Sequence, residues 1–180
     1  VDYVGNPLMD EIGDYRNSAE ILISPKPVLA LLPGSRKQEL ENMLPVMAEA
    51  AKMFKDEFSI HIACTPNFDL SYYKNLVGDL EATYLVDQTY NILNSAKLAM
   101  VTSGTATLEA GIFNVPQVVC YKGNKITIWI ARKLVKLNYI SLVNLIMDKM
   151  VVEELIQEEF TVDNVVKALQ RFQTSEGEAE

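Results

Sequence analysis

The segment from Ser103 to Glu109 holds the residue types whose spacing points to chemistry: a Ser-Gly-Thr turn and, further on, a carboxylate. An apolar run at 98–101 before the turn predicts a buried strand, and the residues after it favour a helix. A strand that stops here and restarts as a helix leaves N–H groups and hydroxyls at the helix N-terminus, where they attract an anion such as phosphate. Glu109 follows Thr105 on the same helix face, where its carboxylate can accept hydrogen bonds from a sugar hydroxyl. The segment therefore suggests a nucleotide-sugar site.

A second loop, Pro33-Gly34-Ser35-Arg36, follows another short apolar run. Gly34 lets a ligand approach the backbone, Ser35 is expected to cap the following helix, and the forked guanidinium of Arg36 suits a diphosphate. The alternative is an ordinary turn and cap with a surface arginine. The chain contains neither Gly-x-x-x-x-Gly-Lys nor Gly-x-Gly-x-x-Gly, which argues against P-loop kinases and against dehydrogenases with the dinucleotide fingerprint.

Strand-like and helix-like segments alternate along the chain. Apolar runs with strand character lie at 28–32, 59–64, 82–86, 98–102 and 116–121. Helical spacing of apolar residues follows at 40–54, 70–77 and 90–95, after Thr105, and from an expected cap at Thr161 to residue 172. This alternation predicts an α/β fold with a doubly wound, Rossmann-like parallel sheet. Ligands of such sheets bind outside the carboxyl ends of the strands, where both loops would lie.

Length and composition favour one domain. The chain has 180 residues, 49% of them apolar, and its net charge of −8 argues against general nucleic-acid binding. We expect a single domain at 1–174 and a disordered acidic tail at 175–180. Cys64 and Cys120 have no partner at metal-ligand spacing and are interpreted as buried, reduced thiols of a cytoplasmic protein. His61 alternates with two isoleucines in an expected strand and is interpreted as structural rather than catalytic.

Positive charge gathers in one part of the chain. No acidic residue lies between Glu109 and Asp148, and this interval holds a basic segment with Lys122, Lys125, Arg132, Lys133 and Lys136. Two interpretations stay open. These bases form a solvated helix face that balances acidic neighbours, or they form a surface for anionic lipid or a phosphorylated ligand, since apolar residues interleave with them.

Five short blocks occur along the chain in an order typical of one known family. They are VGNPL at 4–8, LPGSR at 32–36, TSGTATLE at 102–109, YISLVN at 139–144 and ELIQ at 154–157. In this order they resemble the lipid-A-disaccharide synthase family, from Tyr3 to Phe172. The resemblance is to the carboxyl-terminal half of a two-domain GT-B glycosyltransferase, the half that carries most of the UDP-sugar donor site.

The resemblance implies a hexosyltransferase of lipid A biosynthesis. Its reaction transfers 2,3-diacylglucosamine from the UDP donor to 2,3-diacylglucosamine 1-phosphate, with inversion. Alternatives are another UDP-sugar GT-B transferase, a sugar epimerase with a similar UDP loop, or a non-catalytic nucleotide-binding module.

The resemblance also assigns roles to single residues. Contacts to the donor diphosphate or sugar would come from Gly34, Ser35 and Arg36. The nucleotide-side phosphate loop would comprise Ser103, Gly104, Thr105 and Thr107. Glu109 resembles the acidic residue that GT-B enzymes set against the ribose hydroxyls. Polar positions of the family's late motif, expected to line the same cleft, are Asn144, Glu154 and Gln157. The alternatives are a loop cap for Asn144 and a solvated helix face for Glu154 and Gln157.

Two positions depart from the family pattern: Asn6 stands where a His is usual, and Val143 where a Pro is usual. The resemblance places the general base and the acceptor site in an amino-terminal half, so we expect no catalytic residue in this chain. That half, UDP-2,3-diacylglucosamine and the lipid acceptor are the expected partners.

We expect no metal and no other cofactor. The chain has no Asp-x-Asp, so the helix N-terminus after Ser103 and the guanidinium of Arg36 would stabilise the UDP leaving group. The expected location is cytoplasmic, and peripheral on the inner membrane if the basic segment binds lipid.

Overall fold

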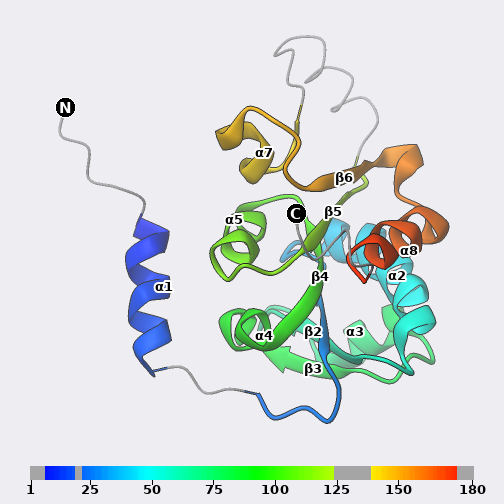
Figure 1. Cartoon of the computed structure of the whole chain (residues 1–180). Coiled ribbons are helices and arrows are strands. Elements are labelled where there is room, and N and C mark those ends of the chain that lie inside the picture. The colour runs from blue at the N-terminus through cyan, green and yellow to red at the C-terminus, as the bar shows by residue number, and fades with distance from the viewer. Residues whose placement is uncertain (1–6, 19–21, 124–138, 174–180) are drawn as a thin grey trace.

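Six parallel strands form one sheet in the order β3-β2-β1-β4-β5-β6 (Figure 1). This computed structural model describes residues 7–18, 22–123 and 139–173. The strands are β1 (Val28–Leu32), β2 (Ser59–Cys64), β3 (Thr83–Val86), β4 (Ala96–Thr102), β5 (Gln117–Tyr121) and β6 (Glu153–Ile156). The predicted parallel α/β sheet is confirmed, and its strand order is that of a Rossmann fold.

Helices cover both faces of the sheet (Figure 1). On one face lie α2 (Lys37–Ala51), the 3-10 turn η1 (Lys52–Phe54), α3 (Leu70–Val77) and α8 (Val162–Arg171). On the other face lie α4 (Thr89–Ser95) and α5 (Thr105–Ile112), and α7 (Leu142–Met147) contacts α5. The remaining described elements are α1 (Pro7–Ser18) and the 3-10 turn η2 (Gln157–Glu159). The expected cap of α8 is confirmed, since the Thr161 hydroxyl accepts the N–H of Asn164 at 3.3 Å.

The core consists of two layers that meet at β1. All five residues of this strand are buried, with Leu29 and Leu31 packed toward α2, and Ala30 and Leu32 packed toward α4. Burial on both faces is what a central strand of a parallel sheet requires, and it explains why these residues form a continuous apolar run without polar alternation. The sheet is therefore anchored at the strand that leads into the Pro33 to Arg36 loop.

The sequence analysis did not predict helices α1 and α7 or strand β6. Helix α1 buries Ile12 and sets the ring of Tyr15 edge-on against Tyr90 and Phe113. Strand β6 pairs with β5 in parallel, so the interpretation of Glu154 as part of a solvated helix face is wrong. Four residues are too few for their alternation to stand out in a sequence.

Several expectations fall on undescribed residues. The acidic tail at 175–180 and all of the basic segment except the exposed Lys122 lie outside the described residues, as does Asn6. The predicted single domain at 1–174 stays a prediction. Among the described residues, no helix is long and apolar enough to cross a membrane.

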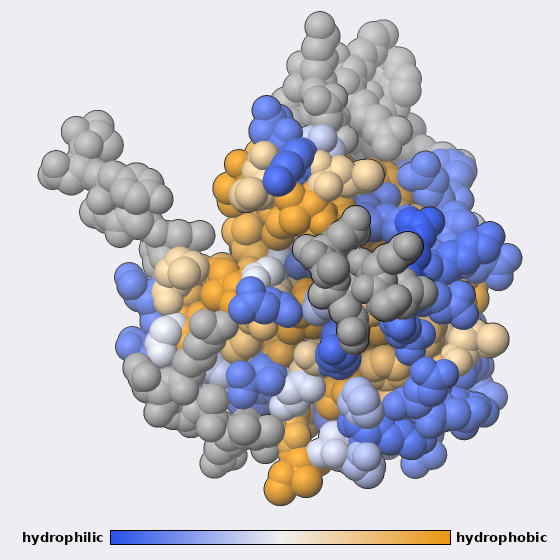
Figure 2. All heavy atoms as spheres, in the orientation of Figure 1, coloured by the Kyte–Doolittle hydropathy of each residue, from blue (hydrophilic) through white to orange (hydrophobic). Residues whose placement is uncertain are grey.

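The surface is uneven in polarity (Figure 2). Hydrophilic side chains dominate the side that carries α8 and α2, whereas apolar side chains gather around α5 and α7. The exposed apolar residues at and after α7 are Ile146, Met147, Met150 and Val151.

A buried side chain, Asn144, ties α7 to the segment before β6. Its Oδ1 accepts the N–H groups of Val151 and Val152 at 2.7 and 2.9 Å. Its Nδ2 donates to the Val152 carbonyl and to Glu154 Oε1, both at 2.8 Å. Every hydrogen-bonding position of this amide is occupied inside the protein, which is how a fully buried Asn avoids a desolvation penalty.

The Glu154 carboxylate completes this network. It accepts the backbone N–H groups of Ile140 and Ser141 at 2.9 Å and the Ser141 hydroxyl at 2.7 Å. The Ser141 Oγ in turn accepts the N–H of Asn144 at 3.3 Å and caps α7. A strand side chain thus holds the start of a helix against the sheet.

Asn144→Ala is expected to lower the free energy of unfolding by about 2–4 kcal/mol, because it removes four hydrogen bonds: those to the N–H groups of Val151 and Val152, the Val152 carbonyl and Glu154 Oε1. Urea unfolding followed by circular dichroism measures the change. Asn94→Ala, at an exposed position in α4, is the control and should change stability by less than about 0.5 kcal/mol. Equal effects of the two substitutions would contradict a structural role for the network.

Candidate functional site

A cavity opens where the chain leaves two neighbouring strands in opposite directions. Strand β1 leads to α2 on one face of the sheet, and β4 leads to α5 on the other face (Figure 1). The cavity of about 520 Å³ is lined by the loop at 33–36 and by residues 102–106, together with Glu39, Thr65, Thr89, Glu109, Ile140 and Leu142. Crevices at this switch point are the usual ligand sites of doubly wound sheets. The structure thus brings both sequence-predicted loops together.

The first turn of α5 offers backbone donors to this cavity. Within the described part of the chain, the N–H groups of Gly104, Thr105 and Ala106 donate to no protein acceptor. Ser103 is held in place, since its hydroxyl donates to the Ile140 carbonyl at 2.9 Å. Thr107 is buried behind the turn, and its hydroxyl donates to the Gly104 carbonyl at 2.8 Å. The turn is therefore held in place by internal hydrogen bonds, while its outer N–H groups can donate to an anion.

Glu109 lies one turn further along α5 and lines the same cavity. Burial raises the pKa of its carboxyl, and the neighbouring Glu11 of α1 adds to that shift. Burial, together with the charges of Glu109 and Glu11, also raises the pKa of Tyr90 to about 12. Keeping a half-buried carboxylate charged costs free energy when few hydrogen bonds offset its lost hydration. Hydrogen bonds from a ligand to Glu109 would reduce that cost.

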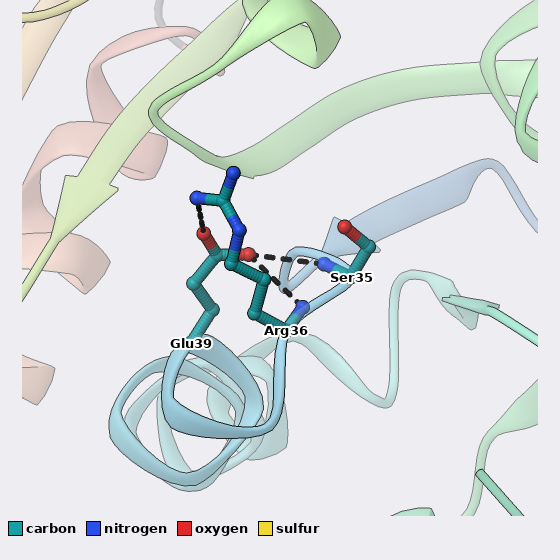
Figure 3. Close-up of polar contacts among 3 residues, drawn as sticks. All are labelled: Ser35, Arg36 and Glu39. Carbon is teal, nitrogen blue, oxygen red and sulfur yellow. Dashed lines mark hydrogen bonds and ion pairs between the residues drawn. The ribbon is translucent and has the colours of Figure 1, made fainter. Parts of the chain in front are cut away.

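The loop between β1 and α2 is organised by a glutamate that the sequence analysis missed (Figure 3). Glu39 Oε2 accepts the backbone N–H groups of Ser35 and Arg36 at 3.1 and 3.2 Å, and Oε1 accepts from Arg36 Nη1 at 3.1 Å. The N-cap residue of α2 is Arg36, so the expectation that Ser35 caps this helix is wrong. The cause is Glu39 at the third helical position, which reaches back to satisfy the free N–H groups.

Gly34 makes this arrangement possible. Its φ of +96° lies in the region that favours glycine, and a Cβ there would clash with Glu39 Oε2. The signal for Glu39 in the sequence is a glutamate three residues after the cap.

The two loops differ in what their N–H groups face. Those at the start of α5 are open, whereas those of Ser35 and Arg36 are taken by Glu39. The charged residues lining the cavity are Arg36, Glu39 and Glu109, so the described lining carries a formal excess of negative charge. The directed N–H groups, rather than the overall charge of the lining, are therefore the feature of this cavity that favours an anion.

Four predicted site residues do not line the cavity: Thr107, Asn144, Glu154 and Gln157. The side chain of Gln157 donates to the Gly123 carbonyl at 3.0 Å and so links the ends of β6 and β5. Glu154 holds the N–H groups of Ile140 and Ser141, next to the cavity wall. Contacts of these four residues with a ligand stay a prediction.

Three lining threonines were not predicted. Thr65 directly follows β2, so the sequence could have predicted that it lies at the carboxyl edge of the sheet. Thr89 begins α4, and no sequence pattern indicated that it lines the cavity. Thr102 ends β4, and its buried hydroxyl has no partner among the described residues.

Three titratable side chains of the strands are buried: those of His61, Cys64 and Cys120. Burial lowers the pKa of His61, which does not line the cavity, so this side chain is uncharged at neutral pH. Cys64 and Cys120 are free thiols, and burial raises the pKa of Cys64 to about 11 and that of Cys120 further. Among residues 7–18, 22–123 and 139–173, no group of three His, Cys, Asp or Glu side chains is placed to hold a metal ion.

Glu109→Gln is expected to raise the melting temperature at neutral pH by about 1–3 °C. A carboxyl whose pKa is raised by folding favours the folded state when protonated, and that stability is lost as the pH rises through the raised pKa. The gain over the wild type should therefore disappear in acid, where Glu109 is neutral. Scanning calorimetry across pH measures it, with the exposed Glu81→Gln as control. A gain that does not vary with pH would contradict the burial effect.

Comparison with known proteins identifies the chain's relatives. A family model described as lipid-A-disaccharide synthetase matches residues 1–179. The lipid-A-disaccharide synthase of Campylobacter jejuni (strain RM1221) is 35% identical over 179 residues, covering 94% of this chain and 48% of the relative. That of Psychromonas ingrahamii (strain DSM 17664 / CCUG 51855 / 37) is 39% identical over 171 residues, covering 91% and 45%. The chain spans about half the length of these curated relatives.

Among solved structures, the spinosyn rhamnosyltransferase SpnG complexed with thymidine diphosphate matches with a TM-score of 0.59 at 14% identity, covering 86% of this chain and 39% of that chain. At this identity the likeness shows the fold alone, a Rossmann-like α/β fold. On the family model and the identity to curated relatives, the chain belongs to the lipid-A-disaccharide synthase family.

Proposed function

We propose that this chain is the donor-binding part of a lipid-A-disaccharide synthase, a glycosyltransferase of lipid A biosynthesis. The reaction transfers 2,3-diacylglucosamine from its UDP donor to 2,3-diacylglucosamine 1-phosphate. The observation that carries the proposal is one cavity at the switch point that combines the open N-terminus of α5, Arg36 and Glu109, in a chain of this family.

Each part of the cavity suits one part of the donor. The N–H groups of Gly104, Thr105 and Ala106 bind the diphosphate, because they are directed donors at the positive end of a helix. Glu109 accepts the ribose hydroxyls one turn further along. Arg36 reaches the diphosphate from the opposite loop.

The same donors stabilise the leaving group. As the bond to the sugar breaks, negative charge grows on the departing UDP, and N–H groups already in place need no reorganisation to meet it. We propose that they and Arg36 carry this step without a metal ion, in line with the absence of Asp-x-Asp from the sequence.

The general base lies outside this chain in the proposal. Glu39 is engaged by Arg36 and its loop, and Glu109 is assigned to the ribose. Inverting transfer needs a carboxylate beside the acceptor hydroxyl, and a facing domain of the GT-B kind would supply that base and the acceptor site.

A lipid-facing surface remains part of the proposal. The acceptor is a lipid, and the apolar residues exposed at and after α7 adjoin a basic residue, Lys149. Together with the basic segment that begins at Lys122, they would hold the protein peripherally on an anionic membrane at the cytoplasmic side.

Two substitutions separate the diphosphate contact from the ribose contact. Arg36→Ala should weaken UDP binding by about 1.5–3 kcal/mol, roughly tenfold to a hundredfold, and leave uridine binding unchanged. Glu109→Ala should weaken both ligands, since the ribose contact does not involve the phosphates. Calorimetric titration of UDP and uridine measures these effects. Unchanged UDP affinity for the Arg36 variant removes Arg36 from the site, and a loss for UDP alone removes Glu109 from the ribose.

The 180-residue chain should bind UDP, yet form no disaccharide from UDP-2,3-diacylglucosamine and the acceptor lipid. Addition of the amino-terminal half of a relative should restore turnover, because it supplies the base and the acceptor site. Product formation from labelled acceptor measures activity, with the full-length Campylobacter jejuni enzyme as positive control.

Two results would contradict the proposal. Turnover by this chain alone, at rates like those of the full-length enzyme, would show that the base is misassigned. Failure of the chain to bind UDP would remove the donor site itself.

A further inference from the structure

The two oxygens of Glu39 have separate tasks (Figure 3). Among the described residues, Oε2 accepts only backbone N–H groups, from Ser35 and Arg36. In the same part of the chain, Oε1 accepts from the Arg36 guanidinium alone. One oxygen therefore shapes the loop, and the other holds the side chain that faces the cavity.

The two side chains differ in how firmly they are held. The Glu39 side chain is 22% exposed and fills the hollow of the loop beside Gly34, whereas the Arg36 side chain is 84% exposed. Within the described part of the chain, the guanidinium has one hydrogen bond, through Nη1. An exposed ion pair of this kind contributes little free energy, so the guanidinium can leave its partner at small cost.

A phosphate oxygen and Glu39 Oε1 make the same demand on Arg36. Both are anionic acceptors that suit the guanidinium fork, and both lie at one cavity. While the Arg36–Glu39 pair is closed, its two charges cancel, and the cavity presents less attraction to an anion.

We propose that Glu39 is a built-in competitor for Arg36: its Oε1 holds the guanidinium while the cavity is empty, and a phosphate group of the ligand takes that place as it binds. Oε2 keeps its backbone N–H groups throughout, so the loop does not reshape. Glu39 is thus a positioning residue that sets affinity for the diphosphate without touching it. The inference rests on the proposed donor site.

Glu39→Gln separates the two tasks. The amide oxygen still accepts the loop N–H groups, whereas the amide NH₂ cannot accept from the guanidinium. The variant should keep a near-native melting temperature and bind inorganic pyrophosphate and UDP about three- to fivefold more tightly than the wild type. Glu41→Gln is the matched control, since it removes one charge from the same helix at a side chain that does not line the cavity.

The arginine dependence is tested in the double variant. In an Arg36→Ala background, Glu39→Gln should tighten pyrophosphate binding by less than twofold, because the side chain it releases is absent. A gain of equal size in both backgrounds would show general charge repulsion and would overturn the competitor role. Weaker or unchanged binding by Glu39→Gln alone would overturn it as well.

A measurement on the wild-type chain needs no substitution. The carboxyl ¹³C resonance of Glu39 should shift as pyrophosphate is added, while that of Glu41 stays constant. An unmoved Glu39 resonance would overturn the inference.

Pyrophosphate also distinguishes a failure of this inference from a failure of the proposed function. If the wild-type chain binds pyrophosphate but not UDP, the proposed function is wrong, while the exchange at Glu39 can still be tested with pyrophosphate. If the chain binds UDP but Glu39→Gln changes neither affinity, the competitor role is wrong and the proposed donor site stands.

Discussion

The adjacency of β1 and β4 is the constraint on which the rest of the structure depends. Because β1 is buried on both faces and pairs with β2 on one side and β4 on the other, the crossovers from β1 and β4 have to pack on opposite faces. The two chain exits then diverge at the carboxyl edge and cannot fill the space between them. That unfilled space is the cavity, and its walls are two helix N-termini, where backbone donors are available without any special sequence.

The first N–H groups of α2 and of α5 have no backbone acceptor within their own helix, and the two helices differ in what satisfies them. At α2 the free N–H groups are satisfied by an internal anion, Glu39, while at α5 they are left for an external one. An N-terminus that already holds a carboxylate is a poor phosphate site, whereas an open one with a braced turn is a good one. This division leaves Arg36 as the part of the first loop that can respond to a ligand, because its side chain is exposed and singly bonded.

The far wall of the cavity is held by polar groups rather than by apolar packing. Asn144 and Glu154 use their hydrogen-bonding capacity on α7 and the segment before β6, and through Ile140 they reach Ser103 at the start of α5. A satisfied polar network of this kind specifies one arrangement, since any other leaves buried groups unpaired. The late motif thus contributes to the site through the wall that it supports, whether or not its residues touch a ligand.

Local pattern in the sequence determined most of the strands and helices, because apolar periodicity and caps such as Thr161 are set by neighbouring residues. It also placed Gly34, Arg36, Ser103 and Glu109 at the carboxyl edge, since strand ends follow directly from those periods. Tertiary structure alone decided that β6 is a strand, that α1 brings Glu11 to Glu109, and that Glu154 faces α7 rather than solvent. These outcomes depend on contacts with residues that are distant in the sequence. The apolar periodicity of a short segment does not reveal which distant residues it will contact.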